Sequence, residues 1–448
     1  MTTQPAYKIW KKTFTSEHLH DLFYEKIAQR TSVGLDWVTS QQFREQLDLE
    51  IDIILRKSSD LTYRFTHYRE VLLSKGRDKL PRCISIPTMR DKLVLAALNE
   101  LLVTTYGNAI VTPMPQIIIS DLICCINSKK YDTFIKIDIK RFYSSINHDI
   151  LMKIIQKTIR KPQILWLLRN AIKTETIPAN MHSNPKARDV GVPEGLSISN
   201  SLASIYMLEI DECFLSQGYK LKYWRYVDDI IILTNSKDAE SISSLLESKL
   251  KQIKLEIHQF DQDDKCSFGQ IKTGFQYLGY VFRDGLVTVR SKSIENFERN
   301  LETLFRTYKH SLNQNDEYIE WKINLKITGF ILENNKYGWT FFYSQITDIS
   351  CLVHLDWLIS KFKKRYKVSN AVHFKKFVRA YHEITKALHK TKYIPNLDTM
   401  GINEKRKIVK KVYGVNTDKL NDGQVDIKFK ALMSREIRDI QKDVQPFS

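Results

Sequence analysis

The sequence predicts an α+β protein in which an antiparallel sheet is flanked by helical segments. Residues 133–146 alternate apolar and polar side chains as a half-buried strand does, and residues 222–233 have the pattern of a β-hairpin. Helical periodicity dominates before residue 60 and after residue 290. A chain of 448 residues with 43% hydrophobic content is long enough to form more than one packed core.

The N-terminal part of the chain predicts helices followed by short strands. The first 60 residues are expected to be helical, with Ser40 as the N-cap of the helix in "SQQFREQLDLEIDIILRK". β-rich pieces broken by Gly76 and two prolines follow, and "MRDKLVLAALNELL" then continues as a helix.

The segment "TFIKIDIKRFYSSI" predicts a strand that runs into a turn, because Ile135, Ile137 and Ile139 alternate with polar residues that include Asp138. Helices are expected from about 148 to 175. The segment "GVPEGLSISNSLASIYMLEIDECF" starts as a glycine-containing loop and continues as a helix.

Two hairpins follow in the sequence. The first, "YWRYVDDIIIL", is expected to carry Asp228 and Asp229 in its turn, and the second, "FQYLGYVFRDGLVTVR", to turn at Asp284 and Gly285. A helix in "SISSLLESKLKQI" lies between them, and the rest of the chain is mostly amphipathic helix. The predicted sheet therefore has helices on one face.

Composition excludes several classes of protein. No apolar run is long enough to cross a bilayer and the first residues lack a secretion signal, so a cytoplasmic location is expected, with no membrane partner. The six cysteines contain no CxxC pair, which argues against a disulfide framework and against zinc.

The charge is strongly basic and unevenly distributed. Lys and Arg total 69 against 51 Asp and Glu, a formal charge of +18, and from Cys351 onward 22 basic residues face 10 acidic ones, a local excess of +12. A polyanion is the natural partner of such a chain. The run "KFKKRYK" at 361–367 is either part of a nucleic-acid surface or a solvated face.

The most informative residues are aspartates. Asp138 ends one predicted strand and Asp228 lies at a hairpin tip, so the two carboxylates converge if the strands are neighbours. Such a pair can hold two divalent ions for nucleotidyl transfer, and Mg²⁺ suits all-oxygen ligands. The alternative is an exposed Asp-Asp turn with an unrelated Asp138.

Three motifs in this order resemble the palm of a reverse transcriptase: "FIKIDIKRFYSSI", "GVPEGLSISNSLASIYM" and "YVDD". The stretches "GLDWVT" and "YRFTHYREVLLSKGRDKLPRCISIPTMRDKLVLAAL" are similar to N-terminal and fingers blocks of bacterial and group II intron enzymes. "FQYLGYVF" is similar to the primer-grip hairpin. The resemblance covers residues 30–300 well and the C-terminal third loosely.

The resemblance implies a right-hand polymerase with fingers, a palm with an antiparallel sheet, a helical thumb and a basic α-helical C-terminal region. The expected divisions are an N-terminal helical extension (1–60), fingers (61–130), a palm (131–290) with a fingers-like helical insertion at about 148–190, a thumb (291–350) and a basic helical RNA-binding region (351–448).

The resemblance also implies roles for individual residues. Asp138, Asp228 and Asp229 would be catalytic and, with Ile139, would hold two Mg²⁺ ions, with Mn²⁺ as an alternative. The residues expected to contact the nucleotide are Lys75, Arg82, Tyr143, Glu194, Gly195 and Lys265. Tyr143 would exclude the ribose 2′-hydroxyl, and Lys265 would protonate pyrophosphate. The residues expected to contact nucleic acid are Lys361, Lys363, Lys364, Arg365, Lys367, Tyr277, Leu278 and Gly279.

One departure from the family pattern lies at Glu194, where a glutamine is usual. A glutamate there either pairs with a cation such as Arg82 or caps the helix that begins near Ser199. No endonuclease-like Cys/His cluster follows the thumb, which argues against a mobile intron protein. The segment "ITGFILENNKYGWTFFYSQITDISCLVHLDWLISKF" is similar to prokaryotic defence-associated reverse transcriptases.

The resemblance implies an RNA-directed DNA polymerase that copies an RNA template from a DNA or RNA primer with dNTPs. The similarity to defence-associated enzymes further implies that the template is a dedicated structured non-coding RNA and that the protein acts in antiviral defence. The alternatives are an untemplated or protein-primed polymerase of abortive-infection type, a retron enzyme, and an RNA-binding protein with a vestigial site. RNA-dependent RNA synthesis is disfavoured by Tyr143.

Overall fold

The computed structural model describes residues 5–74, 80–180, 189–216, 220–260 and 265–444. The chain forms two compact units. Unit 1 combines Met1–Pro113 with Thr133–Phe268, and unit 2 combines Met114–Asp132 with Gly269–Ser448. The range 61–130, predicted as fingers, therefore contributes to both units. No helix within the described ranges is both long and apolar enough to cross a membrane.

Unit 1 is built around a four-stranded sheet with the strand order β5-β6-β3-β7. β3 and β6 pair antiparallel, and Ile135 and Ile137 lie opposite Ile232 and Ile230. All four isoleucine side chains are fully buried in one core. The strands are β3 (Thr133–Asp138), β5 (Leu221–Tyr226), β6 (Asp229–Thr234) and β7 (Ser267–Gln270). The alternation in the sequence thus predicted the buried face of this sheet.

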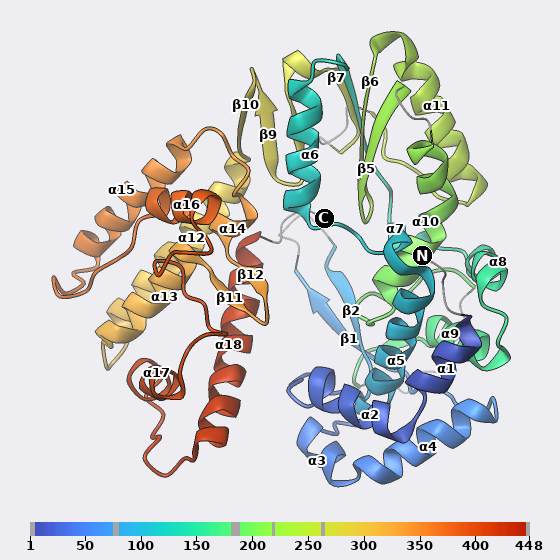
Figure 1. The fold of residues 1–448 in the computed structure, drawn as a ribbon, viewed down its shortest axis with the longest axis horizontal. Coiled ribbons are helices and arrows are strands. Elements are labelled where there is room, and N and C mark those ends of the chain that lie inside the picture. The colour runs from blue at the N-terminus through green and yellow to red at the C-terminus, as the bar shows by residue number, and fades with distance from the viewer. Residues whose placement is uncertain (1–4, 75–79, 181–188, 217–219, 261–264, 445–448) are drawn as a thin grey trace. The chain divides into compact units, whose positions relative to one another are not determined.

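Helices α10 (Ser199–Leu215) and α11 (Ser236–Gln252) pack against this sheet (Figure 1). Their positions confirm the two helices predicted on either side of the aspartate hairpin. α8 (His148–Thr158) and α9 (Pro162–Lys173) confirm the helical stretch predicted at 148–175 and pack against each other. The short α7 (Phe142–Ser145) connects β3 to this helical part.

The N-terminal part of unit 1 is helical, as predicted. Its elements are α1 (Ala6–Thr13), α2 (Ser16–Leu22), α3 (Ser40–Glu45), α4 (Leu47–Ser59) and α5 (Met89–Tyr106). The N-cap of α3 is Thr39 rather than Ser40. The Thr39 hydroxyl accepts from the Gln42 amide while the Gln42 side chain accepts from the Thr39 amide, so the capping box selects the earlier residue.

A second sheet in unit 1 has the order β2-β1-β4. β1 (Tyr68–Leu73) and β2 (Arg82–Ile86) are antiparallel, and β4 (Thr176–Ile177) runs parallel to β1. The Asp91 carboxylate ties the segment that leads into β1 to α5, because it accepts from the Tyr63 hydroxyl at 2.8 Å and from the Thr66 amide at 3.1 Å. β2 pairs with β1, and Arg82 is its first residue.

Unit 2 contains the second predicted hairpin, which is in fact a three-stranded meander. The Asp284–Gly285 turn joins β9 (Tyr280–Arg283) to β10 (Leu286–Val289), as predicted. A further strand, β8 (Phe275–Tyr277), pairs with β9 across a turn at Leu278 and Gly279, both with positive φ. A two-residue turn with two positive φ values matches the twist of the strands, which allows the extra strand to pair.

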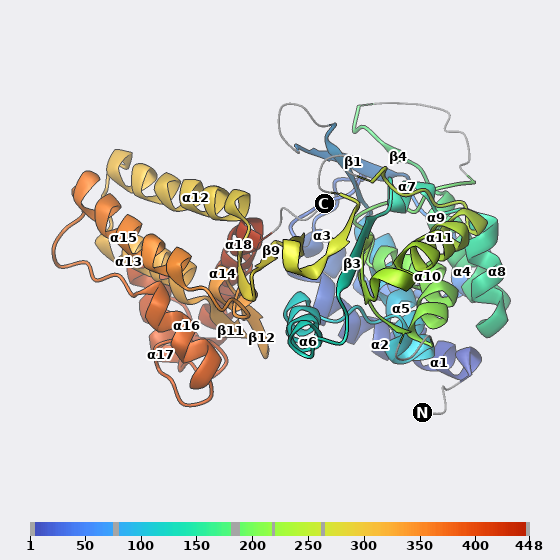
Figure 2. The ribbon, with the colours of Figure 1, turned by 90° about the horizontal axis from the view of Figure 1, so that it is seen from above.

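The remaining elements of unit 2 are mainly helical. α12, α13, α15 and α18 form its main packed helices (Figures 1 and 2). The elements are α6 (Pro115–Asn127), α12 (Ser291–His310), α13 (Asp316–Thr328), β11 (Phe330–Leu332), β12 (Asn335–Tyr337), α14 (Trp339–Phe342), α15 (Ser350–Arg365), α16 (Phe377–Lys386), α17 (Ile402–Lys407) and α18 (Asp422–Val444).

Two buried ion pairs join α13 to α18. Lys322 contacts Glu436 at 2.6 Å, with side chains only 5% and 6% exposed. Lys326 pairs with the buried Asp443, which also accepts from Asn300 at 2.9 Å. Burying a charge is costly unless it is paired, so these pairs favour one register of α18 on α13.

Replacing Lys326 with alanine should lower the free energy of unfolding of unit 2 by about 3–5 kcal/mol, because it leaves the Asp443 carboxylate buried without its cation. Denaturant unfolding of the full chain, followed by a probe in unit 2, measures this loss. The double variant Lys326→Met with Asp443→Leu should recover most of it. Lys410→Ala, which breaks the exposed pair with Asp418, should cost less than about 1 kcal/mol. Equal losses for the two alanine variants would contradict this account.

Candidate active site

Three aspartates meet at the end of the central sheet of unit 1. Asp138, the last residue of β3, lies directly opposite Asp229, the first residue of β6. Asp228 immediately precedes it, and its carbonyl accepts from the Ile139 amide at 3.3 Å. The sequence placed both Asp228 and Asp229 in the turn, and this is wrong for Asp229. The turn consists of Val227 and Asp228, and β6 starts one residue earlier than expected.

The register explains why these carboxylates share one face. Ile135 and Ile137 point into the helix-covered core, so Asp138, one position on, points to the opposite face. Residues directly opposite in an antiparallel pair lie on the same face, which brings Asp229 beside Asp138.

The surroundings of Asp228 and Asp229 disfavour the ionised form of both carboxylates. Burial, reinforced by repulsion from Asp138, raises the pKa of Asp228 to about 6. Burial and repulsion from Asp228 and then Asp138 raise the pKa of Asp229 to about 8. A divalent cation would relieve this repulsion, and carboxylate oxygens are the ligands that Mg²⁺ prefers.

A lysine ammonium is in direct contact with this cluster. Lys265 donates from Nζ to Asp138 Oδ2 at 2.8 Å, and the His258 ring nitrogen Nε2 lies 3.4 Å from the same oxygen. Lys265 Nζ and His258 Nε2 are 2.9 Å apart. The sequence pointed to Lys265 but not to His258, which an isolated bridge between Ile139 and Ile257 brings to this edge.

The hairpin turn that carries Asp228 is strained. Val227 has φ +59°, a left-handed backbone that a β-branched residue rarely adopts. The buried Arg225 guanidinium donates to the Val227 carbonyl at 2.9 Å and pairs with Asp211 on α10. These two contacts of Arg225 hold the strained turn against α10. Backbone strain of this kind is characteristic of functional sites. Nothing in the sequence connects Arg225 to Asp211 before α10 is placed on the sheet.

A second group of predicted residues lies near the aspartates. Arg82 forms an ion pair with Glu194, and both side chains are about one-third exposed. The Glu194 carbonyl accepts from the Ser85 amide at 2.7 Å. Helix α10 has no side-chain cap, because its N-cap residue is Ile198, and the Ser199 hydroxyl donates to the Pro193 carbonyl. Of the two arrangements considered for Glu194, the structure has the pair with Arg82.

Gly195 allows this loop to pack closely on β2. Its φ is +99°, and a Cβ at this position would lie 2.7 Å from Ile84 Cγ2. Any other residue would therefore push the loop away from the strand that carries Arg82.

Tyr143 lies between these two groups. Its side chain is 9% exposed and its hydroxyl donates to Asn200 Oδ1 at 2.6 Å. Burial raises the pKa of Tyr143, and the charges of Asp228, Arg82 and Glu194 act on it as well. The ring is thus held in one position by α10, on which Asn200 lies. Sequence reasoning missed Asn200, since its role depends on this contact.

The remaining predicted residues are more scattered. Lys75 lies outside the described residues. The Ile139 side chain is buried, so a metal contact is limited to its backbone carbonyl. In unit 2, Tyr277 and Leu278 are 1% and 4% exposed, so only the backbone of the turn with Gly279 is available to a partner.

The five basic residues predicted to bind nucleic acid differ in their contacts. Lys363 donates to the Val372 carbonyl, and Arg365 pairs with Glu302 at 3.0 Å. Lys361, Lys364 and Lys367 are exposed and form no ion pair with any described residue.

The aspartates do not form a closed metal cage. Among the described residues, no group of three or more His, Cys, Asp and Glu side chains is arranged to hold a metal ion. Mg²⁺ at a nucleotidyl-transfer site is usually bound by one or two carboxylates together with substrate phosphates. The hard oxygen ligands and their mutual repulsion fit such a substrate-completed site at Asp138, Asp228 and Asp229.

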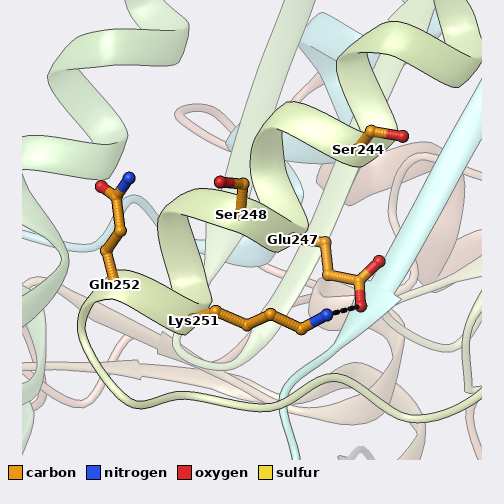
Figure 3. A pocket seen from close by; sticks show the side chains of 5 residues that line it. All are labelled: Ser244, Glu247, Ser248, Lys251 and Gln252. Atoms are coloured by element: carbon orange, nitrogen blue, oxygen red, sulfur yellow. Dashed lines mark ion pairs between the residues drawn. The ribbon is translucent and has the colours of Figure 1, made fainter.

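A separate pocket of about 530 Å³ lies on the surface of α11 (Figure 3). Within it Lys251 and Glu247 pair at 2.7 Å, so their charges satisfy each other. It contains none of the predicted site residues, and its lining is Ser244, Glu247, Ser248, Lys251 and Gln252. The aspartate edge of the sheet is therefore the candidate active site.

Comparison with known proteins identifies this part of the chain. The family model described as reverse transcriptase (RNA-dependent DNA polymerase) matches residues 74–282, which contain the three aspartates, Arg82, Tyr143 and Glu194. The candidate active site therefore lies in a stretch that matches reverse transcriptases, and the chain is an enzyme, an RNA-dependent DNA polymerase.

Individual proteins are similar to parts of this chain. Protein YkfC of Escherichia coli is 22% identical over 348 residues, covering 67% of this chain and 86% of YkfC. An uncharacterized 91 kDa protein in the cob intron of Schizosaccharomyces pombe is 30% identical over 176 residues, 36% of this chain and 20% of that protein. Among solved structures, apo telomerase from Candida tropicalis, truncated from its C-terminal domain, aligns with a TM-score of 0.41 and 14% identity over 56% of this chain and 60% of that one.

The raised pKa of Asp229 leads to a pH-dependent prediction. Its pKa is about 8 in the folded protein against 3.8 for the ordinary side chain, so the folded state holds a proton that the unfolded chain releases between these pH values. The contribution of Asp229 to the free energy of unfolding is therefore greatest below about pH 4 and is lost as the pH rises through about 8. The Tm of Asp229→Asn relative to wild type should rise across this window, measured without divalent cations.

Asp211→Asn is the matched control. Asp211 pairs with the buried Arg225, so its substitution should lower Tm at every pH in the window. A Tm difference between Asp229→Asn and wild type that does not change with pH would contradict the electrostatic account of the site.

Proposed function

We propose that the chain makes cDNA on an RNA template by two-metal nucleotidyl transfer at Asp138, Asp228 and Asp229. The observation that carries this proposal is the register that sets Asp138 opposite Asp229 with Asp228 at the adjoining turn. Bound Mg²⁺, or Mn²⁺ in its place, would activate the primer hydroxyl and stabilise the leaving oxygen. The three carboxylates would hold the ions, and Val227 would hold Asp228 in place through its strained turn.

The residues around the aspartates would bind the incoming nucleotide. The Arg82 guanidinium lies at the start of β2 and would contact the triphosphate. Its ion pair with Glu194 would fix the direction of its planar donor group. Lys265 Nζ would carry the proton that pyrophosphate takes on leaving, since it already lies 2.8 Å from a catalytic carboxylate.

The partner proposed for this active site is a dedicated structured non-coding RNA, with a role in defence against phage. Two features support this: the excess of +12 charge after residue 350, and the similarity of the segment that starts in α13 to defence-associated enzymes. The untemplated or protein-primed polymerase and the retron enzyme share the same carboxylates, so the product separates them. A vestigial site would not need three half-buried, mutually repelling aspartates.

One experiment tests the polymerase and its template together. The wild-type chain, purified from its native host, should copurify with one abundant RNA species and with DNA complementary to it. Asp228→Asn should copurify with the same RNA but no complementary DNA, because a neutral amide cannot replace the anionic metal ligand. Sequencing both nucleic acids gives the result. DNA with no complementary RNA would instead favour the untemplated polymerase, and complementary DNA from Asp228→Asn would refute the catalytic assignment.

The same pair of proteins tests the defence role. Expression of the wild-type chain together with its RNA should lower the plating efficiency of a susceptible phage, and Asp228→Asn should not. Equal plating on both strains would leave the polymerase assignment intact and refute the role in defence.

Tyr143→Ala should raise the use of ribonucleotides relative to deoxyribonucleotides by tenfold or more, about 1.4 kcal/mol in transition-state discrimination, because the ring no longer occupies the space beside the 2′ position. The ratio of kcat/KM for a matched ribonucleotide and deoxyribonucleotide measures the change. Tyr143→Phe is the control: it loses the Asn200 hydrogen bond but keeps the ring, and should keep the wild-type ratio. An unchanged ratio in a folded Tyr143→Ala would remove Tyr143 from this role.

A further inference from the structure

Helix α15 presents a large aromatic ring to solvent. Trp357 is 54% exposed, and Val353, one turn earlier, is also 54% exposed. The buried face of the same helix lies on the opposite side and consists of Cys351, Leu352, Leu355, Leu358, Ile359 and Phe362. Trp357 is therefore not part of the core that holds α15 in unit 2.

The face around Trp357 is positively charged. Lys361 lies one turn further, with its ammonium 4.7 Å from the centre of the indole ring. Lys364 continues the same face, since residues seven apart fall close together on a helix. Neither ammonium forms an ion pair with a described residue, so both charges are available to a ligand.

The acidic residues near this face are already engaged. Asp356, the one acidic residue of α15, accepts from the amides of Phe377 and Val378. On α12, Glu298 contacts His354 at 2.7 Å, and Glu302 accepts from Arg365 and from the Tyr366 hydroxyl. The exposed face of α15 itself carries no acidic side chain, as its sequence shows.

We propose that this face of α15 binds a single-stranded segment of RNA, with one base stacked on Trp357 and phosphates held by Lys361 and Lys364. This inference rests on the proposed RNA partner. It adds the residues that bind the RNA and the single-stranded conformation of the RNA segment that they bind. An exposed indole beside unpaired cations combines the two parts of a single-strand site, which are a stacking platform and charge for the backbone.

Single-stranded RNA fits this face better than a duplex does. The bases of a duplex stack on one another, and their faces are inaccessible to a ring that projects from a convex helix. An unpaired base, as in a loop or a strand end, can lie on the indole when the Lys361 ammonium moves from the ring to a phosphate of the same strand. Since every base has a π-face, we expect little dependence on base identity.

The experiment compares two labelled probes on the full chain, a U-rich single strand of about 16 nucleotides and a blunt RNA duplex of the same length, by fluorescence anisotropy at fixed salt without divalent cations. Trp357→Ala should raise the Kd for the single strand by about 5- to 150-fold, the range expected for one lost base–aromatic stack. The Kd for the duplex should change less than about twofold. Trp357→Phe should keep most of the single-strand affinity.

Matched controls lie on the same helix. Val353→Ala removes an equally exposed apolar side chain without a π-face and should leave both Kd values unchanged. Lys361→Gln with Lys364→Gln should reduce the salt slope for the single strand by about 1.4, since each phosphate contact on a single strand contributes about 0.7. Equal Tm values for all variants establish that they are folded, as expected for substitutions at exposed positions.

Several results would overturn the proposal. They are an unchanged single-strand Kd in Trp357→Ala, equal losses on both probes, and a loss in Val353→Ala as large as in Trp357→Ala, which would instead indicate an apolar protein-binding face. Failure of the wild-type chain to extend a primer would bear on the proposed polymerase function alone, because the binding measurement involves no catalysis.

Discussion

The repulsion among three carboxylates at one end of a buried sheet is the constraint on which the rest of unit 1 depends. Asp138 and Asp229 share a face because they are directly opposite in an antiparallel pair, and Asp228 adjoins them at the turn. Partial burial raises the pKa of both hairpin aspartates. A fold optimised for stability alone would not place acids there, so this cost supports the metal-dependent function proposed above.

The residues around the three carboxylates hold the backbone of the site in place but neutralise only part of its negative charge. The Arg225 guanidinium, anchored by Asp211, holds the strained Val227 turn. Lys265 pairs with Asp138, and a metal ion would compete with it for this carboxylate. The Arg82 guanidinium and the Tyr143 ring lie near Asp228, and its charge interacts with both. The site is thus rigid in its backbone while part of its charge remains unbalanced.

The lysines of unit 2 have two different roles, one in the core and one on the surface. Lys322 and Lys326 are buried and paired, and they fasten α18 to α13. Lys361 and Lys364 are exposed, and neither pairs with a described carboxylate, so their positive charge is directed to solvent. The basic excess of the C-terminal part therefore includes both a structural component and a surface component, and only the surface component can attract a polyanion.

The sequence by itself determined the strand periodicity, the order of the palm motifs and the identity of the three aspartates, because alternation and motif spacing are local properties. The sequence pattern predicted the start of β6 one residue too late, and it predicted Ser40 rather than Thr39 as the N-cap of α3. Both features depend on hydrogen bonds that form only in the folded chain. Tertiary structure alone decided which partners meet: His258 with Asp138, Asn200 with Tyr143, Arg225 with Asp211, and Glu194 with Arg82 rather than with a helix end. It also decided that Trp357 is exposed while Phe362 is buried, because helix packing selects which face of α15 is covered, and composition carries no information about that choice.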